Sequence, residues 1–255
     1  MHRFCSAGYT TTGGIVMQYG YRSAAAAAGC RAEAAAPAAG FRVKDPVSAG
    51  THFVACLAAV LCTPVMLTHA AGQGADLAGM TAQSAFMLGM VLLYGASAAY
   101  HTFDISVKAN KRLKKLDHSM IFVLIAGSYT PVCLLVLPAG IGRFLLALVW
   151  SIAAAGILLK NCWVFCPKWF SSVLYIGMGW VCVLAMPQLL VCLSPFCFGW
   201  LLAGGVAYTA GGVIYALKLS AFNRLCPGFG SHEVFHLFVM LGSICHFVCM
   251  WNLPM

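Results

Sequence analysis

Long apolar stretches dominate this chain and restrict it to folds that a lipid bilayer can hold. Of its 255 residues, 62% are hydrophobic and only 8% are charged, whereas about a quarter of the residues in a soluble domain are charged. A helix needs about 20 apolar residues to cross a bilayer. Stretches of that kind occupy seven ranges, which are 47–68, 81–101, 117–138, 141–159, 170–192, 195–217 and 231–253.

These seven stretches favour helices over strands. A helix satisfies its own backbone hydrogen bonds in lipid, and the short alternating pattern of a transmembrane barrel is absent from the sequence. We therefore predict an all-α fold, a polytopic membrane protein built as a seven-transmembrane helix bundle.

The basic residues gather on alternate connections between the expected spans. All of the 15 Lys and Arg residues except Arg143 lie before the first span or after the second, fourth and sixth. Cytoplasmic segments are enriched in Lys and Arg, so we expect the N-terminus in the cytoplasm and the C-terminus outside the cell (plasma) membrane. The net charge of +9 is then a topology signal beside anionic lipid, and it does not indicate nucleic-acid binding.

Residues 1–44 differ in composition from the rest of the chain. The segment 23–40 reads SAAAAAGCRAEAAAPAAG, and Glu33 is the single acid of this region. Such a sequence cannot bury enough apolar surface to fold alone. We interpret 1–44 as a low-complexity, disordered tail, with an Arg-bearing transit peptide as the alternative, and 45–255 as the membrane domain.

The 13 cysteines do not predict a disulfide framework once they are assigned to the expected topology. Most lie within spans or on the expected cytoplasmic side, which is reducing. Cys192 and Cys197 flank a short external turn and are the one plausible pair. Cys162 and Cys166, in CWVFC, could bind a metal but have no second ligand pair nearby, so we expect free thiols.

Polar side chains near the ends of three spans fall on one side of the expected membrane. They are His101 at the end of the second span, Asp117 at the start of the third, and His232 and His236 at the start of the seventh. With seven spans, all four lie at the cytoplasmic end. Polar side chains inside spans are rare and usually mark a functional site.

The spacing of these residues indicates a metal site. His232 and His236 share a helix face and can bind one ion, and Ser97 shares a face with His101. Three imidazoles leave a fourth position for water, which is typical of catalytic zinc. Asp117 could then act as a base or bind the metal directly, while Ser97 could orient the water or a substrate carbonyl.

The remaining histidines have simpler interpretations. His52, His69 and His118 are expected at headgroup level, where an interfacial histidine usually lies. His246 is about 15 Å along the helix from His236 at ~1.5 Å per residue, so we expect a hydrogen-bonded packing residue.

His232–His236 also reads HEVFH and fits the H-E-x-x-H signature of zinc proteases, in which Glu233 would be the general base. A membrane-embedded protease normally takes a third ligand from a downstream Asp, and none follows here. We interpret Glu233 as an acid near a helix N-terminus, where negative charge is favoured.

Pro131 lies within the third expected span, where it removes a backbone donor and clashes with the preceding turn. We predict a bend near 127–131, with Ser128 and Thr130 satisfying freed carbonyls. No bend as sharp is expected in 232–250.

Five segments resemble the hemolysin III family, relatives of the adiponectin and progestin receptors. They are DPVSAGTHF (45–53), SAAYH (97–101), KKLDHSMIFVLIAGSYTP (114–131), PKWF and MGW (within 167–180) and SHEVFHLFVMLGSICHF (231–247). The resemblance covers 45–253. It implies zinc held by His101, His232 and His236, with Asp117 and Ser97 completing the pocket.

The resemblance also implies three functions. The first is a zinc-dependent lipid amide hydrolase, similar to ceramidases, with a membrane lipid such as ceramide as substrate. The second is a hemolysin III-type cytolysin or channel with a structural zinc site, although no separate amphipathic pore-forming segment is visible. The third is a signalling receptor, but the long extracellular parts of the animal receptors are not visible, so hormone binding is not carried over.

Overall fold

The computed structural model describes residues 42–217 and 229–255, and these residues contain helices and no strand. The elements are α1 (Pro46–Gly72), α2 (Leu77–Thr102), α3 (Val107–Pro131), η1 (Val132–Val136), α4 (Ala139–Cys162), α5 (Lys168–Gly179), η2 (Trp180–Ala185), α6 (Met186–Cys192), α7 (Pro195–Leu217) and α9 (Ser231–Trp251). Seven helical stretches in this part of the chain are long and apolar enough to cross a membrane. The all-α prediction with seven spans is confirmed. Most of the expected tail, together with Lys218 and Arg224, lies outside the described residues.

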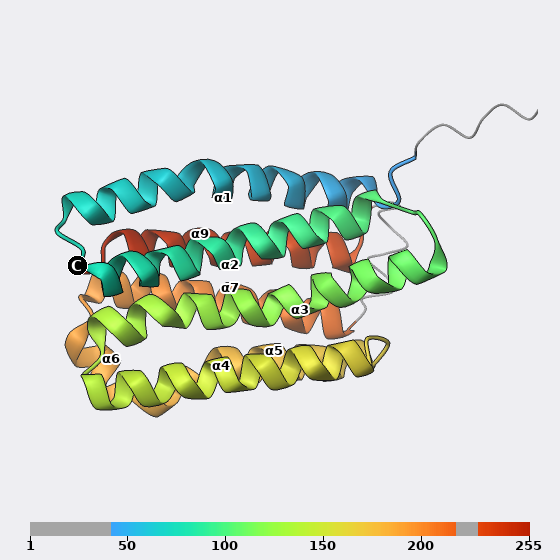
Figure 1. The fold of residues 1–255 in the computed structure, drawn as a ribbon. Coiled ribbons are helices and arrows are strands. Elements are labelled where there is room, and N and C mark those ends of the chain that lie inside the picture. Colours follow the sequence, from blue (N-terminus) through green and yellow to red (C-terminus); the bar gives the residue numbers. More distant parts are fainter. Residues whose placement is uncertain (1–41, 218–228) are drawn as a thin grey trace, which may run out of the picture. The chain divides into compact units, whose positions relative to one another are not determined.

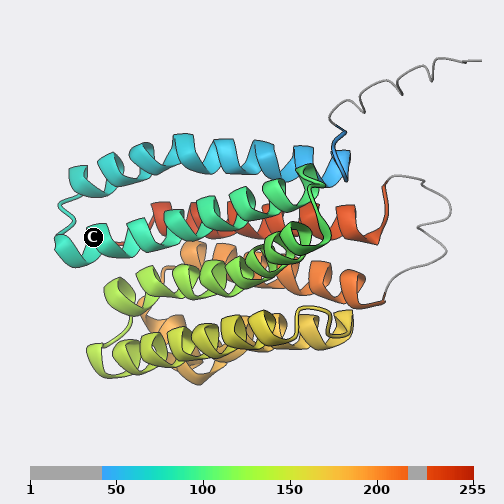
Figure 2. The same cartoon turned by 45° about the vertical axis from the view of Figure 1, so that its right-hand side comes forward.

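The seven spans pack in chain order, and the ring closes where the first span meets the last (Figures 1 and 2). α1 packs on α2, α2 on α3 and α3 on α4; α4 and α5 are neighbours, α5 packs on α7, α7 on α9, and α9 returns to α1. Hydrogen bonds also cross the ring between α2 and α9, where Gln83 Nε2 donates to the Met250 carbonyl at 3.0 Å and Tyr94 donates to Ser243 Oγ at 2.6 Å. Paired polar groups of this kind join helices in an apolar environment.

The third helix begins well before the apolar stretch that predicted it. We expected Lys108–Lys115 in a connection, but these residues form the first turns of α3, which Ser106 caps by accepting a hydrogen bond from the Ala109 N–H. Lys and Arg are good helix formers, and hydropathy alone excluded them. Lys115 also donates to the Asn161 carbonyl at the end of α4, where a cation is favourable. Asp117 therefore does not open a span, since it lies about three turns inside a helix.

Two spans depart from regular α-helix geometry. α3 is α-helical up to Pro131 and continues as the π-helical segment η1, so the irregularity follows the range 127–131 in which we predicted a bend, and the bend itself stays a prediction. Ser128 and Thr130 donate to the carbonyls of Ile125 and Ala126, while α9 is uninterrupted. The fifth span is broken by the 3₁₀ segment η2, which we did not predict. Pro187 follows and lacks the N–H that a continuous helix would need there.

Two glycines allow α7 and α9 to approach closely. A Cβ at Gly204 would collide with the His246 ring, and one at Gly242 would lie 2.8 Å from the Tyr208 ring. Small residues at helix contacts are the usual means of close packing in membranes. The two glycines leave room for the side chains of His246 and Tyr208 between α7 and α9.

A buried cation lies beside the connection between α4 and α5. Lys160 is fully buried, and its Nζ lies 3.0 Å from Cys166 Sγ and 2.5 Å from Ser171 Oγ. Burial raises the pKa of the Cys166 thiol, but the hydrogen bonds from Lys160 and Ser171 outweigh it, so the pKa lies below its ordinary value. Every cysteine in the described ranges is a free thiol, including Cys192 and Cys197.

Candidate metal centre

Three histidines meet at one end of the bundle, which we call the histidine end. His101 lies in the last turn of α2, and His232 and His236 lie in the first turns of α9. Each offers a ring nitrogen, and these nitrogens all lie within 4.8 Å of one another. The shortest contact joins His101 Nε2 and His232 Nε2 at 3.2 Å. The three ligands proposed from the sequence are therefore neighbours, although they come from distant parts of the chain.

Asp45, which sequence reasoning missed, fixes the orientation of His101. Its Oδ2 lies 2.9 Å from His101 Nδ1, and its backbone N–H donates to the His101 carbonyl at 2.8 Å. A carboxylate on one ring nitrogen turns the other nitrogen towards a metal and raises its basicity. The signal in the sequence was an acid directly before the first span, on the same expected side as the histidines. Lys44, at the end of the expected tail, donates to the Tyr100 carbonyl beside it.

The residues present fit a zinc ion. Nε2 of His101 and Nε2 of His232 lie 3.2 Å apart, and His236 offers a ring nitrogen to the same group. Three imidazoles within reach of one point are a zinc-type donor set with an open fourth position.

Asp117 and Ser97 lie beside the three histidines. Both are buried, the hydroxyl of Ser97 interacts with the Asp117 carboxylate, and both line the cavity that His232 and His236 also line. Asp117 Oδ2 accepts a hydrogen bond from His118 Nδ1 at 3.0 Å. Among the described residues, the group of candidate ligand atoms that lie within 4.8 Å of one another contains the three histidines and not Asp117.

Of the four other histidines with a prediction, one is confirmed and two are corrected, while His69, whose Nε2 lies 3.1 Å from the Trp251 carbonyl, keeps its headgroup-level position as a prediction. His246 is buried with Nε2 3.3 Å from the Leu201 carbonyl, as expected of a packing residue. His118 is not a free headgroup-level side chain, because it is bound to Asp117. His52 is only 3% exposed and stacks on His236, so the headgroup-level prediction for it was wrong. Its burial follows from the contact between α1 and α9, which local sequence does not reveal.

Glu233 has a structural role that uses both carboxylate oxygens. Oε2 accepts from the Gly230 N–H at 2.7 Å, and Oε1 accepts from the Ser48 hydroxyl at 2.9 Å. The first bond caps α9, and the second ties α1 to it. These two contacts agree with the interpretation of Glu233 as a helix-end acid.

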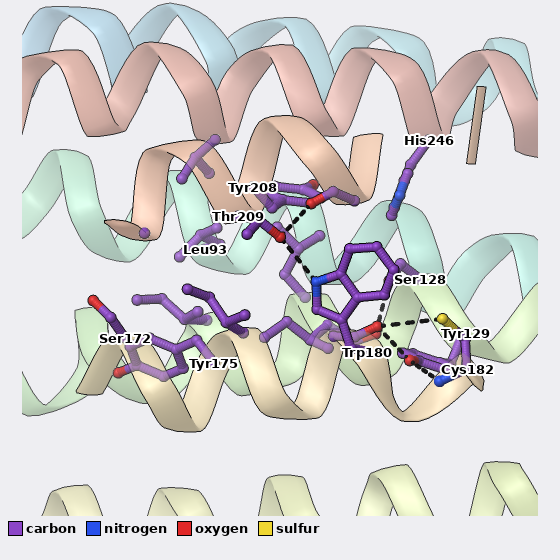
Figure 3. A pocket seen from close by; sticks show the side chains of 18 of the residues that line it. Leu93, Ser128, Tyr129, Ser172, Tyr175, Trp180, Cys182, Tyr208, Thr209 and His246 are labelled. Atoms are coloured by element: carbon purple, nitrogen blue, oxygen red, sulfur yellow. Dashed lines mark hydrogen bonds between the residues drawn. The ribbon is translucent and has the colours of Figure 1, made fainter. Parts of the chain in front are cut away.

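A long apolar cavity leads from the histidine end into the ring. Its lining includes His232, His236 and Asp117 at the histidine end, and side chains of α3, α5, η2 and α7 along the rest. Figure 3 shows part of this wall, where Trp180 Nε1 donates to Thr209 Oγ1 at 2.9 Å. Tyr129 donates to the Gly179 carbonyl and accepts from the Cys182 N–H. Because these polar groups bond one another, the deep wall offers mainly apolar surface.

Comparison with known proteins assigns the family. Residues 42–247 match the family described as "Haemolysin-III related". The chain belongs to this family. It is 34% identical over 212 residues to "Hemolysin-3" of Bacillus cereus, covering 82% of this chain and 91% of the relative. It is also 34% identical over 216 residues to "Hemolysin-3 homolog" of Bacillus subtilis (strain 168), covering 82% and 94%.

A more distant relative belongs to the receptor branch that the sequence motifs suggested. The "Adiponectin receptor protein" of Drosophila melanogaster is 27% identical over 189 residues, which cover 64% of this chain and 40% of that protein. Together with the seven spans, these matches identify a multi-pass membrane protein related to hemolysin III proteins and adiponectin receptors.

Proposed function

We propose that this protein is a zinc-dependent hydrolase of lipid amide bonds, similar to ceramidases, which acts at the cytoplasmic face of the plasma membrane. The observation that carries the proposal is the convergence of His101, His232 and His236 beside an apolar cavity that Asp117 also lines. A site for a structural ion alone has no need of an adjoining cavity or a buried carboxylate.

The chemistry of the proposed reaction divides among few residues. Zinc bound by the three imidazoles would lower the pKa of a water molecule and polarise a carbonyl. Asp117 takes a proton from the water as the water oxygen bonds to the amide carbon, and it delivers that proton to the amine nitrogen when the C–N bond breaks. His118 holds Oδ2 of Asp117, and Ser97 holds the carboxylate from the α2 side.

The cavity supports a lipid as the substrate. A long acyl chain can lie along the apolar wall formed by α3, α5 and α7, while its amide carbonyl lies near the histidines. Burying the chain removes apolar surface from contact with water at about 25 cal/mol per Å². This arrangement orients the amide before any reaction takes place.

Hydrolysis of a labelled ceramide by zinc-loaded protein in detergent tests the proposal. We expect release of free fatty acid by the wild type and a loss of roughly 10²–10⁴-fold in rate for Asp117→Asn, the usual scale of acid–base help. Glu233→Gln should retain most of the activity, whereas a protease would lose it. Intact ceramide after incubation with zinc-loaded wild-type protein would refute the hydrolase.

A second candidate function rests on the printed name of the Bacillus cereus relative, "Hemolysin-3". In that case the chain permeabilises membranes, and the metal clamps α2 to α9. Leakage of dye from liposomes containing the wild-type protein, with no ceramide cleavage, would favour this function. A signalling role, suggested by the name of the Drosophila relative, ranks third.

A further inference from the structure

His52 is a buried polar side chain that the proposed reaction does not use. It lies in the second turn of α1, is 3% exposed and lines the cavity beside His236. Neither ring nitrogen has a hydrogen-bond partner among the residues that the structure describes. A backbone group of His236 lies close to the ring but makes no hydrogen bond of normal geometry with either nitrogen.

The orientation of the ring shows that His52 is not a fourth metal ligand. The rings of His52 and His236 are stacked, with centroids 3.7 Å apart and planes inclined by 10°. The lone pairs of an imidazole lie in the ring plane, so two parallel rings cannot both direct a nitrogen at one ion. Tyr94 meets His52 edge-on at 5.0 Å, which holds the ring in this orientation.

The unpaired nitrogens indicate a partner that arrives with the ligand. A buried polar group without a hydrogen bond costs about 1–3 kcal/mol, and a neutral imidazole offers one donor and one acceptor. In the proposed reaction the substrate carbonyl faces the three metal-binding histidines, and the water faces Asp117. A hydroxyl group next to the amide is then the polar group of the lipid that still needs a partner.

We infer that His52 is a substrate-binding residue that hydrogen-bonds a hydroxyl group at the polar end of the lipid. The site would therefore prefer amides of hydroxylated long-chain amines over amides that lack the hydroxyl. This inference rests on the proposed function for the position of the amide. It adds a specificity determinant on α1, an element that supplies none of the metal ligands.

A pair of matched substitutions tests the role of His52. His52→Phe keeps an aromatic ring for the stack on His236 and removes both nitrogens. His69→Phe is the control, because His69 also lies on α1 and stacks on an aromatic ring, that of Trp251, away from the cavity. The substrates are a ceramide and an N-acyl alkylamine of the same length without hydroxyl groups.

We expect His52→Phe to lower kcat/KM for the ceramide about 10-fold, the effect of one buried hydrogen bond, and to change the value for the alkylamide less than about 2-fold. Zinc content should stay unchanged, and His69→Phe should behave as the wild type on both substrates. An equal loss on both substrates, or a loss of zinc, would mean that the ring only supports His236. Failure of the wild type to discriminate between the two lipids would also overturn the inference, even if the variant does not fold.

Equilibrium binding separates this inference from the proposed function. Radiolabelled ceramide and alkylamide are bound to zinc-loaded Asp117→Asn protein, with and without His52→Phe. If the wild type cleaves neither lipid but the ceramide preference in binding disappears with His52→Phe, the hydrolase proposal fails and the role of His52 stands. Equal binding of the two lipids by both proteins contradicts the role of His52, whatever the wild type hydrolyses.

Discussion

Asp45 acts on the candidate zinc site from outside the set of ligands. It holds Nδ1 of His101 through a contact of 2.9 Å and, through its backbone, the last turn of α2. His101 is the only one of the three histidines that does not come from α9. The direction of its Nε2 therefore decides whether the two sides of the site can meet on one ion.

Replacing Asp45 by Asn should weaken zinc binding 10–100-fold, the usual effect of losing such a partner. Competition with a chromogenic chelator measures the affinity. Asp104→Asn serves as the control, since Asp104 is an exposed acid bonded to Asn110 and should leave zinc affinity unchanged. Equal affinity in the wild type and Asp45→Asn would show that the carboxylate does not orient His101.

The three histidines together should hold about one zinc per chain, as expected of three imidazoles with one open position. Elemental analysis of detergent-purified protein measures this content. The variant with Ala at His101, His232 and His236 should contain none above background. Zinc in that variant equal to the wild type would place the metal elsewhere.

At the scale of elements, the contact between α7 and α9 determines where the deep cavity wall lies. Gly204 has no room for a Cβ because the His246 ring occupies that space, whereas the adjacent Gly205 has nothing within 4 Å of the same position. The two glycines share a helix and differ in what they face. They form a natural pair for measuring the strength of this contact.

We expect Gly204→Ala to lower the free energy of unfolding by about 1–3 kcal/mol, the usual effect of overpacking. Gly205→Ala should be neutral or slightly stabilising, because Ala is the better helix former. Thermal unfolding in one detergent compares the two. Equal melting temperatures for both variants would mean that α7 and α9 can move apart at this position without lowering the stability of the protein.

The sequence predicts features that depend on residues within one span, and it does not predict features that depend on contacts between spans. Hydropathy and charge predict the spans and bring His101 and His232 to one end, because both properties are local to each span. The start of α3 was missed because its first turns are basic, and hydropathy counts such residues as loop. His52 and Asp45 were missed for another reason: their roles arise from contacts of the first span with the last span and with α2, and no local pattern records such contacts.

At the scale of the whole molecule, the described membrane domain is a closed ring that contains every residue of the candidate site. The family match begins at residue 42, close to where α1 starts. All the candidate site residues that the sequence motifs identify lie after residue 42. The boundary of the membrane domain near residue 45 stays a prediction.

Deleting residues 1–40 should therefore change neither zinc content nor melting temperature, because Ala-rich sequence of low complexity cannot form a core of its own. The truncated and full chains are purified in parallel, and metal analysis and thermal unfolding are applied to both. A large loss of either property on truncation would show that the tail stabilises the bundle.

The division of the metal ligands between α2 and α9 has a consequence for biosynthesis. A membrane protein is made and inserted from its N-terminus onwards, and two of the three histidines belong to α9, which follows the other described helices in the chain. A nascent chain interrupted before residue 231 carries only His101 of the three candidate ligands. In the proposed site, the ion can therefore be held only after α9 has been made, and it then links α9 to α2.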